Sequence, residues 1–243
     1  MFSKKITFSS PVSNYIEKPI PALQYIPDVY KKLSKRDSIN HGPNEGTVKA
    51  CIPFLDALTT GYIIPFPIDV CFAIEESTQN ENRIRKVNMQ TSKNIPKEFY
   101  NYFFLHSHPN TQIPDSLKHN HRTINTTLKL GNPWHIKTPP GYSCMFTNPF
   151  NRNLPFKIID GIVDTDNYPL HINFPFFWTN DPSIKETYIA KGSPMALVIP
   201  FKRENWQMET IEKQTQSPFD FMRLGAHVRD AYKKIFWNKK SYK

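Results

Sequence analysis

Proline is the residue that most constrains how this chain can fold. The sequence holds 22 prolines and only 8 glycines among its 243 residues. Proline has no N–H to donate to a sheet ladder, and it breaks a helix when it lies in the interior. A chain this rich in proline therefore favours short strands joined by stiff loops, and the sequence predicts a mainly β protein.

Short apolar segments separated by proline, glycine or asparagine follow one another between residues 132 and 201. They read HIK, YSCMFT, FKIIDGIVD, LHINFPFFW, TYIAKG and MALVIPF. Strands at this spacing are typical of a sandwich or barrel-like β core. Further strands are expected at residues 61–64, 69–74, 83–89 and 100–105.

Changes in composition divide the chain into three predicted regions. Residues 1–46 are expected to form a Pro-rich N-terminal arm with one short helix, and residues 47–206 a β-rich core domain that includes a short helix near residues 54–58. Residues 207–243 are expected to form a C-terminal helix with a basic tail. The run Ser-Pro-Phe-Asp at 217–220 predicts where this helix begins, because it supplies an N-cap, a proline and an acid in the first turn.

Charge and apolar content limit the class of protein. Lys and Arg number 31 against 21 Asp and Glu, which gives a formal net charge of +10. No apolar run approaches the roughly 20 residues that a membrane span needs, and no signal-peptide pattern opens the chain. Three cysteines without a CxxC spacing do not predict a disulfide framework. We therefore expect a chain that is neither secreted nor inserted in a membrane.

One pair of segments resembles an enzyme superfamily. GIVDTDNYPLHINF (161–174) and KGSPMALVIPF (191–201) resemble the hairpin and the following strand of dUTPases and dCTP deaminases. The resemblance implies a β-clip fold, with Asp164 as the base that activates water and Tyr168 as the platform for deoxyribose. Beside phosphates held by Mg²⁺, a carboxylate can act in this way.

The phosphate-binding part of that pattern differs. The family has Arg-Ser-Gly after the strand that corresponds to YSCMF, whereas this chain reads TNPFNRN and offers Arg152 alone. Aspartates also bond their own backbone in tight turns, so Asp164 and Asp166 equally suit a structural hairpin. The expectation is a β-clip core without a complete active site, and a nucleotide hydrolase or deaminase is the alternative.

A second motif offers metal ligands. His106, Ser107, His108 and then Ser116 resemble the H-x-H-x7-S-x2-D motif of JAMM metalloproteases, with His119 in place of the final acid. Two imidazoles on alternate residues of a strand end can hold one zinc ion. A zinc-dependent hydrolase is therefore a second alternative, and histidines that simply end a strand are the structural interpretation.

The C-terminal region combines cations with aromatic rings. Such a mixture can bind phosphates or an acidic partner, although a charged run on a helix is more often a solvated face. The residues expected to contact a partner, nucleic acid included, are Arg229, Lys233, Lys234, Trp237, Lys239 and Lys240.

Three long segments resemble a family of uncharacterised proteins encoded by tailed phages. They are CIPFLDALTTGYIIPFPIDV, NPWHIKTPPGYSCMFTNPFNR and VIPFKRENW, and they cover roughly residues 48–206. The resemblance implies a phage origin and a place in the host cytoplasm or the virion. With the incomplete catalytic set, it predicts a non-enzymatic protein that binds other phage proteins and further copies of itself. No cofactor is expected; Mg²⁺ or Zn²⁺ belongs to the two enzyme alternatives.

Overall fold

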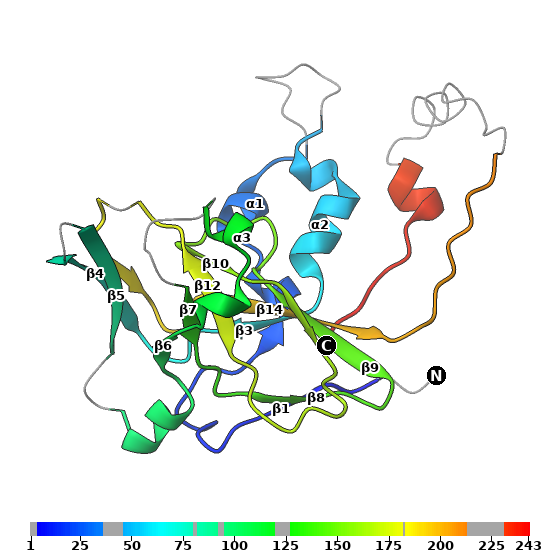
Figure 1. Cartoon of the computed structure of the whole chain (residues 1–243). Coiled ribbons are helices and arrows are strands. Elements are labelled where there is room, and N and C mark those ends of the chain that lie inside the picture. Colours follow the sequence, from blue (N-terminus) through cyan, green and yellow to red (C-terminus); the bar gives the residue numbers. More distant parts are fainter. Residues whose placement is uncertain are drawn as a thin grey trace. The chain divides into compact units, whose positions relative to one another are not determined.

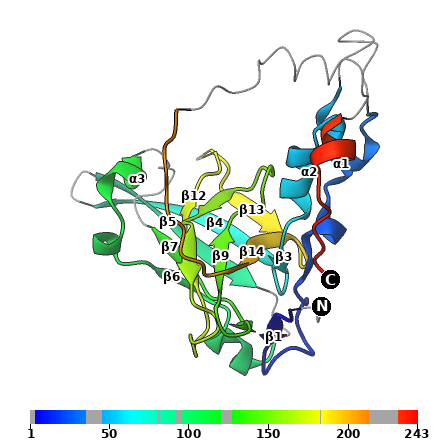
Figure 2. The ribbon, with the colours of Figure 1, turned by 90° about the vertical axis from the view of Figure 1, so that its right-hand side faces the viewer.

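The chain forms two compact units, each made from segments far apart in the sequence (Figures 1 and 2). Unit 1 joins Met1–Ile20 to Gly61–Lys202, and unit 2 joins Pro21–Thr60 to Arg203–Lys243. The structure is a computed structural model, which describes residues 4–35, 46–79, 82–91, 95–119, 127–181, 183–212 and 231–243.

Strands dominate the fold, which confirms the predicted mainly β class. Their bounds are β1 (Thr7–Ser9), β2 (Ile20–Pro21), β3 (Tyr62–Pro65), β4 (Val70–Gln79), β5 (Asn82–Thr91), β6 (Leu105–Ser107), β7 (Leu128–Leu130), β8 (His135–Lys137), β9 (Tyr142–Thr147), β10 (Phe156–Ile158), β11 (Gly161–Val163), β12 (Phe174–Trp178), β13 (Glu186–Ile189) and β14 (Pro194–Lys202). The described strands make four sheets, ordered β1-β8, β10-β12-β7-β6, β11-β9-β14-β3-β2 and β13-β4-β5.

The burial of each strand follows its place in a sheet. β14 lies between β9 and β3, and its residues from Met195 to Val198 are all buried, so the strand reads as a continuous apolar run. β5 is at the edge of its sheet and alternates: Val87 is buried, whereas Lys86 and Asn88 are exposed. Alternation of this kind is expected where only one face of a strand packs on the core.

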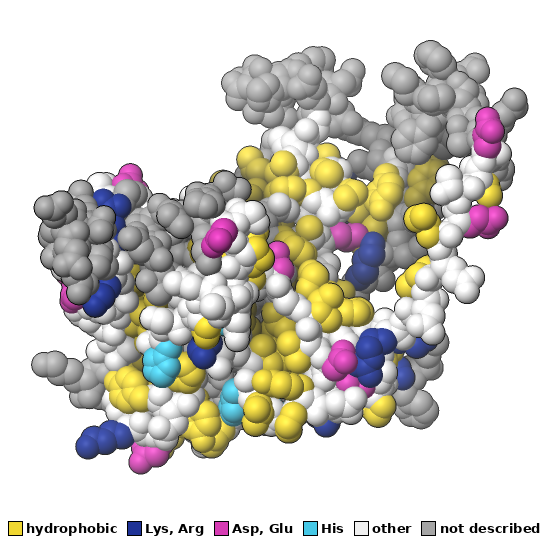
Figure 3. All heavy atoms as spheres, in the orientation of Figure 1, with side chains coloured by type: hydrophobic (Ala, Val, Ile, Leu, Met, Phe, Trp, Pro, Cys, Tyr) yellow, Lys and Arg dark blue, Asp and Glu magenta, His cyan; other side chains and the backbone are white. Residues whose placement is uncertain are grey.

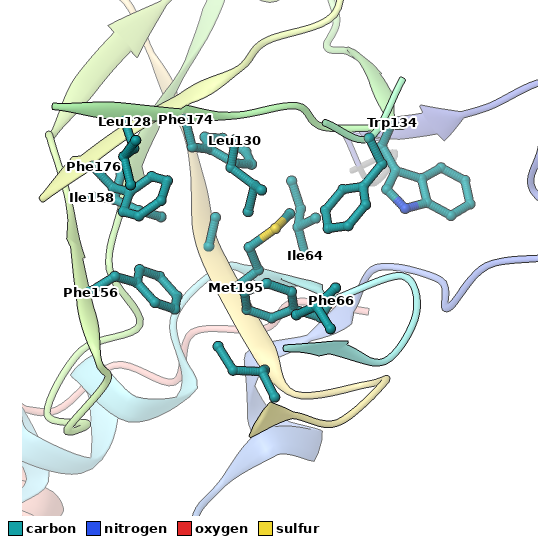
Figure 4. Close-up of a cluster of buried hydrophobic side chains, with 14 of the residues drawn as sticks. Ile64, Phe66, Leu128, Leu130, Trp134, Phe156, Ile158, Phe174, Phe176 and Met195 are labelled. Carbon is teal, nitrogen blue, oxygen red and sulfur yellow. The ribbon is translucent and has the colours of Figure 1, made fainter. Parts of the chain in front are cut away.

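The core of unit 1 is rich in aromatic rings (Figure 4). The ring of Phe66 is 1% exposed and lies edge-on to Phe156, Phe72 and Phe103, with centroid distances of 5.8, 6.4 and 6.5 Å. Burying one such ring contributes roughly 1.5–3 kcal/mol. These phenylalanines lie on or beside strands of different sheets, so the core holds the sheets of unit 1 together.

Gly61 sets the path of the chain into β3. Its φ is +76°, and a Cβ atom there would lie 2.3 Å from the carbonyl oxygen of Val198. Both the left-handed backbone and the close approach of β14 require a residue without a side chain. These two constraints explain why one of the few glycines in this proline-rich sequence occupies position 61.

Helical segments are short. Unit 2 holds η1 (Ala22–Tyr25), α1 (Asp28–Lys32), η2 (Val48–Ala50), α2 (Ile52–Thr59) and the π-helical turn η5 (Tyr232–Phe236), and unit 1 holds η3 (Lys97–Asn101), η4 (Asn110–Gln112) and α3 (Asp115–His119). A proline in the first turn begins α2, as the sequence predicts for residues 54–58. Tyr30 of α1 packs edge-on against Phe54 of α2 at a centroid distance of 5.3 Å.

The structure departs from the sequence-based expectations in one strand. The aromatic segment 100–105, expected as a strand, is largely the end of η3 and a loop, and β6 starts only at Leu105. The regions 1–46, 47–206 and 207–243 stay a prediction; in the structure, β1 pairs with β8 in unit 1, and α2 packs with η1 and η2 in unit 2. Most of the predicted C-terminal helix, residues 213–230, lies outside the described residues.

Candidate functional site

The structure places Asp164 and Tyr168 in a single turn after β11. The backbone N–H groups of Asn167 and Tyr168 both donate to the carbonyl of Asp164, at 3.0 and 2.9 Å. The hydroxyl of Ser143 donates to the Asp164 carboxylate at 2.6 Å. The predicted base and sugar platform are therefore close in space, and the polar groups of the turn also have structural partners.

The rest of this turn is joined to the loop before β9. The carboxylate of Asp166, which is 8% exposed, accepts the N–H of Gly141 at 2.8 Å. The hydroxyl of Thr165, fully buried, lies 2.7 Å from that of Thr138 and donates to the sulfur of Cys144 at 3.3 Å. Burial raises the pKa of this thiol to about 11, so it stays protonated at neutral pH.

Arg152, the predicted phosphate ligand, lies half-buried in the loop that follows β9. It directly follows Asn151, whose φ of 55° is left-handed. The β9 strand that leads into this loop pairs with β11, the strand that leads into the Asp164 turn. The Arg152 loop and the Asp164 turn are therefore reached from neighbouring strands of one sheet, and a phosphate-binding role for Arg152 stays a prediction.

His106 and His108 lie at the end of β6. The ring of His106 is exposed and stacks on Phe104 at a centroid distance of 4.6 Å. Burial, and then the positive charge of Lys129, lower the pKa of His108. His119 is the last residue of α3. Within the described parts of the chain, no three His, Cys, Asp or Glu side chains gather as a metal site would require, and a zinc role for these histidines stays a prediction.

The basic C-terminal residues divide into two groups. Trp237 donates its indole N–H to both carboxylate oxygens of Asp56 in α2, at 2.9 and 3.1 Å, and Lys240 contacts the same carboxylate at 2.6 Å. These two predicted contact residues therefore have partners inside unit 2. Three others are exposed, namely Lys233, Lys234 and Lys239, and Arg229 lies outside the described residues.

A groove of about 610 Å³ lies between β5 and β6 in unit 1. Its lining comprises Arg85, Lys86, Val87, Asn88, Met89, Thr91, Tyr100, Phe103, Phe104, Leu105, His106, Ser107 and Leu128. Successive residues of a strand point to opposite faces of the sheet. A hollow lined by consecutive residues of β5 therefore runs along the edge of that strand, where its backbone N–H and C=O groups lie. Among the described strands, β5 pairs only with β4, and β6 only with β7. The groove is thus bounded by two edges with unpaired N–H and C=O groups.

The floor of this groove is apolar. Val87, Phe103 and Leu128 are 6%, 0% and 5% exposed, and all three belong to the lining. A peptide that covered this floor would remove apolar surface from water, which is the main source of favourable binding free energy. The groove therefore offers both apolar contact and backbone hydrogen bonds.

The rim of the groove is cationic. The cation Lys86 is exposed, whereas Arg85 pairs with Glu76 at 2.8 Å. None of the lining residues is acidic. This charge favours an occupant with carboxylates at its outward positions.

A second hollow, of about 820 Å³, lies at the opposite ends of the same two sheets, beside β10 and β13. Its lining residues carry no charge, and the side-chain amide of Asn180 donates to the hydroxyl of Thr187 at 2.9 Å within it. The two hollows have similar positions in the fold, but only the groove between β5 and β6 combines open edges with a charged rim.

The sequence analysis missed this groove. Residues 82–91 show the signal that was available, because NRIRKVNMQT is largely polar and carries three cations with no acid. That pattern is typical of an edge strand. The sequence does not show which other edge lies opposite, because β6 reaches the groove only through the tertiary fold.

No protein-family model matches this chain, and neither does any curated protein. No helix in the described ranges is long and apolar enough to cross a membrane. The function is therefore argued from the geometry of the groove and of the turn.

Proposed function

We propose that this is a phage-encoded, non-enzymatic structural protein, associated with the virion or its assembly in the host cytoplasm, that works by binding other protein chains on a dUTPase-like β-clip core. The observation that carries the proposal is the groove between β5 and β6, bounded by two unpaired strand edges. An enzyme does not need such edges, whereas a protein that binds an extended polypeptide does.

Strand addition is the mode of binding that fits the groove. An extended peptide along β5 would pair its backbone with the open edge and place alternate side chains on the floor. The remaining side chains would lie on the side of Lys86 and Asn88, which are exposed on β5. The preferred ligand is therefore an extended segment that alternates apolar and acidic residues.

The contacts of the Asp164 turn favour binding over catalysis. The carboxylate of Asp164 accepts the Ser143 hydroxyl, and that of Asp166 accepts the Gly141 N–H. Hydrogen bonds of this kind account for aspartates at a tight turn without a reaction. The resemblance to dUTPases then concerns the β-clip scaffold, which serves many functions.

The first test measures peptide binding. An alternating Glu–Val decapeptide with blocked ends is expected to bind the full-length protein at least about fivefold more tightly than the matching Lys–Val peptide. Lys86→Glu should reduce this preference, whereas Lys5→Glu, which changes an exposed cation outside the groove lining, should leave it intact. Equal affinities, or no binding of either peptide, would overturn the proposal.

The second test is a turnover screen. The purified protein, incubated with deoxynucleoside triphosphates and either Mg²⁺ or Zn²⁺, is expected to leave them unchanged. Hydrolysis or deamination that Asp164→Asn abolishes, with folding intact, would instead support the nucleotide enzyme. Turnover that His106→Ala abolishes only with Zn²⁺ would support the metal-dependent alternative.

A further inference from the structure

Residues 205–212, hereafter the arm, are the most exposed apolar stretch in the described chain. The side chains of Trp206, Met208 and Ile211 are 86%, 93% and 64% exposed. Figure 3 shows hydrophobic and acidic side chains along this stretch, which is orange in Figures 1 and 2. Apolar side chains this exposed mark a surface that contacts another molecule.

The backbone of the arm is also unpaired. No helix, strand or turn includes residues 205–212, and their N–H and C=O groups make no hydrogen bond to another described residue. The exposed backbone groups of such a segment can exchange their hydrogen bonds to water for bonds to a strand edge of the groove. Pairing the two would satisfy backbone groups on both sides.

The charges of the arm and the groove are complementary. The arm reads NWQMETIE, with two acids and no base, so its formal charge is −2. The rim of the groove carries the cation Lys86, and none of its lining residues is acidic. The chain as a whole has a charge of +10, so copies would otherwise repel one another, and a local match of this kind is what a contact between them requires.

Between residues 206 and 209, the alternation of the arm matches that of β5. In an extended arm, Trp206 and Met208 point to one face and Glu209 to the other. On β5, Val87 faces the floor while Lys86 lies on the opposite face. When the apolar pair covers the floor, Glu209 is therefore on the same side as Lys86.

We propose that the arm of one copy of this protein adds as a strand to the β5 edge in the groove of a second copy. This inference rests on the proposed function and names the partner of the same groove. The bound arm buries Trp206 and Met208 against the groove floor and places Glu209 near Lys86. Exchange of a segment between identical chains is a common route to oligomers.

Engineered disulfides test the contact directly. One tagged full-length chain carries Met208→Cys and the other Ser107→Cys, both with Cys51→Ser because Cys51 is exposed. Mixing the chains under mild oxidation is expected to join arm and groove as a heterodimer. The control places the second cysteine at Ile162, which is 65% exposed on β11 and outside the groove lining, and should give at most a tenth as much product. Equal linking to both positions, or none to Ser107→Cys, would overturn the inference.

Self-association tests the same contact without a covalent bond. Sedimentation equilibrium should show that Trp206→Ala with Met208→Ala weakens association at least about tenfold. Lys86→Glu and Glu209→Lys should each weaken it about fivefold, and one chain with both changes should recover most of the loss. A monomeric wild-type protein would overturn the inference. If the Glu–Val peptide still bound the groove, the proposed function would stand; if it did not, both would fall.

Discussion

The Asp164 turn and the groove between β5 and β6 differ in where their hydrogen-bonding groups find partners. In the turn, Asp164 and Asp166 accept hydrogen bonds from Ser143 and Gly141 of the same unit. In the groove, two strand edges lack partners among the described strands. Residues that resemble a catalytic motif thus have partners within the fold, while a segment without any motif borders the groove for which we propose binding.

This difference concerns how far a catalytic-like sequence motif can indicate function. A carboxylate at a turn is required by the backbone of that turn as often as by a reaction. An open edge beside an apolar floor has no such internal purpose, and natural sheets usually protect their edges. For this reason our proposal of function rests on the strand edges and not on the turn.

The largest expected effect on the unfolding free energy distinguishes a residue of the groove floor from a residue of its rim. Phe103→Ala removes a ring that is 0% exposed and packs on Phe66 and Phe99, so we expect it to lower the unfolding free energy by about 3–5 kcal/mol. Lys86→Glu on the rim should change it by less than about 0.5 kcal/mol. Urea unfolding followed by circular dichroism measures both, and equal effects would show that the rim is part of the core.

The next effect tests whether the turn is structural. Asp166→Ala leaves the N–H of Gly141 without its acceptor and should lower the unfolding free energy by about 1–3 kcal/mol. Asn167→Ala, at an exposed position of the same turn, is the control and should cost well under about 1 kcal/mol. A stable Asp166→Ala protein would mean that the hydrogen bonds of the turn are dispensable for folding.

A smaller effect on the unfolding free energy is expected for a hydrogen-bonded side chain in unit 2. Asp56→Ala removes the acceptor shared by Trp237 and Lys240, and we expect a loss of about 1 kcal/mol and greater exposure of the indole. Acrylamide quenching of fluorescence measures that exposure in a chain whose other three tryptophans are changed to phenylalanine. Unchanged quenching would indicate that Trp237 does not depend on Asp56 for its position.

The smallest effect is a pH dependence at His108, which directly follows β6. The pKa of His108 is lowered by burial and by Lys129, so the unfolded chain binds this proton more readily than the folded protein. The unfolding free energy should then fall as the pH drops from about 6.5 toward the pKa of the folded state. Solvent screening keeps this change small. His108→Gln should flatten this slope, and His106→Gln serves as the comparison; a slope that survives His108→Gln must come from another group.

Local patterns in the sequence predicted several elements correctly. The strands expected at residues 61–64 and 83–89 and the short helix expected near residues 54–58 each have the predicted type of structure. The strand expected at residues 100–105 was wrong because Phe99 and Phe103 are buried side by side from a helical turn, at a centroid distance of 5.5 Å. Aromatic residues suit either conformation, and packing decided between them.

The sequence by itself determined the mainly β class, because 22 prolines and short apolar segments permit little else. It also determined which positions of β5 are cationic and which positions of the arm are apolar. Only the tertiary structure decided that β5 and β6 lie across one groove, and that Trp237 and Lys240 bind Asp56, from which they are 181 and 184 residues distant. The spacing of apolar residues and the composition are local properties of a sequence. Whether a strand edge stays open, and which side chain finds a hydrogen-bond partner, depends on which distant segments pack together.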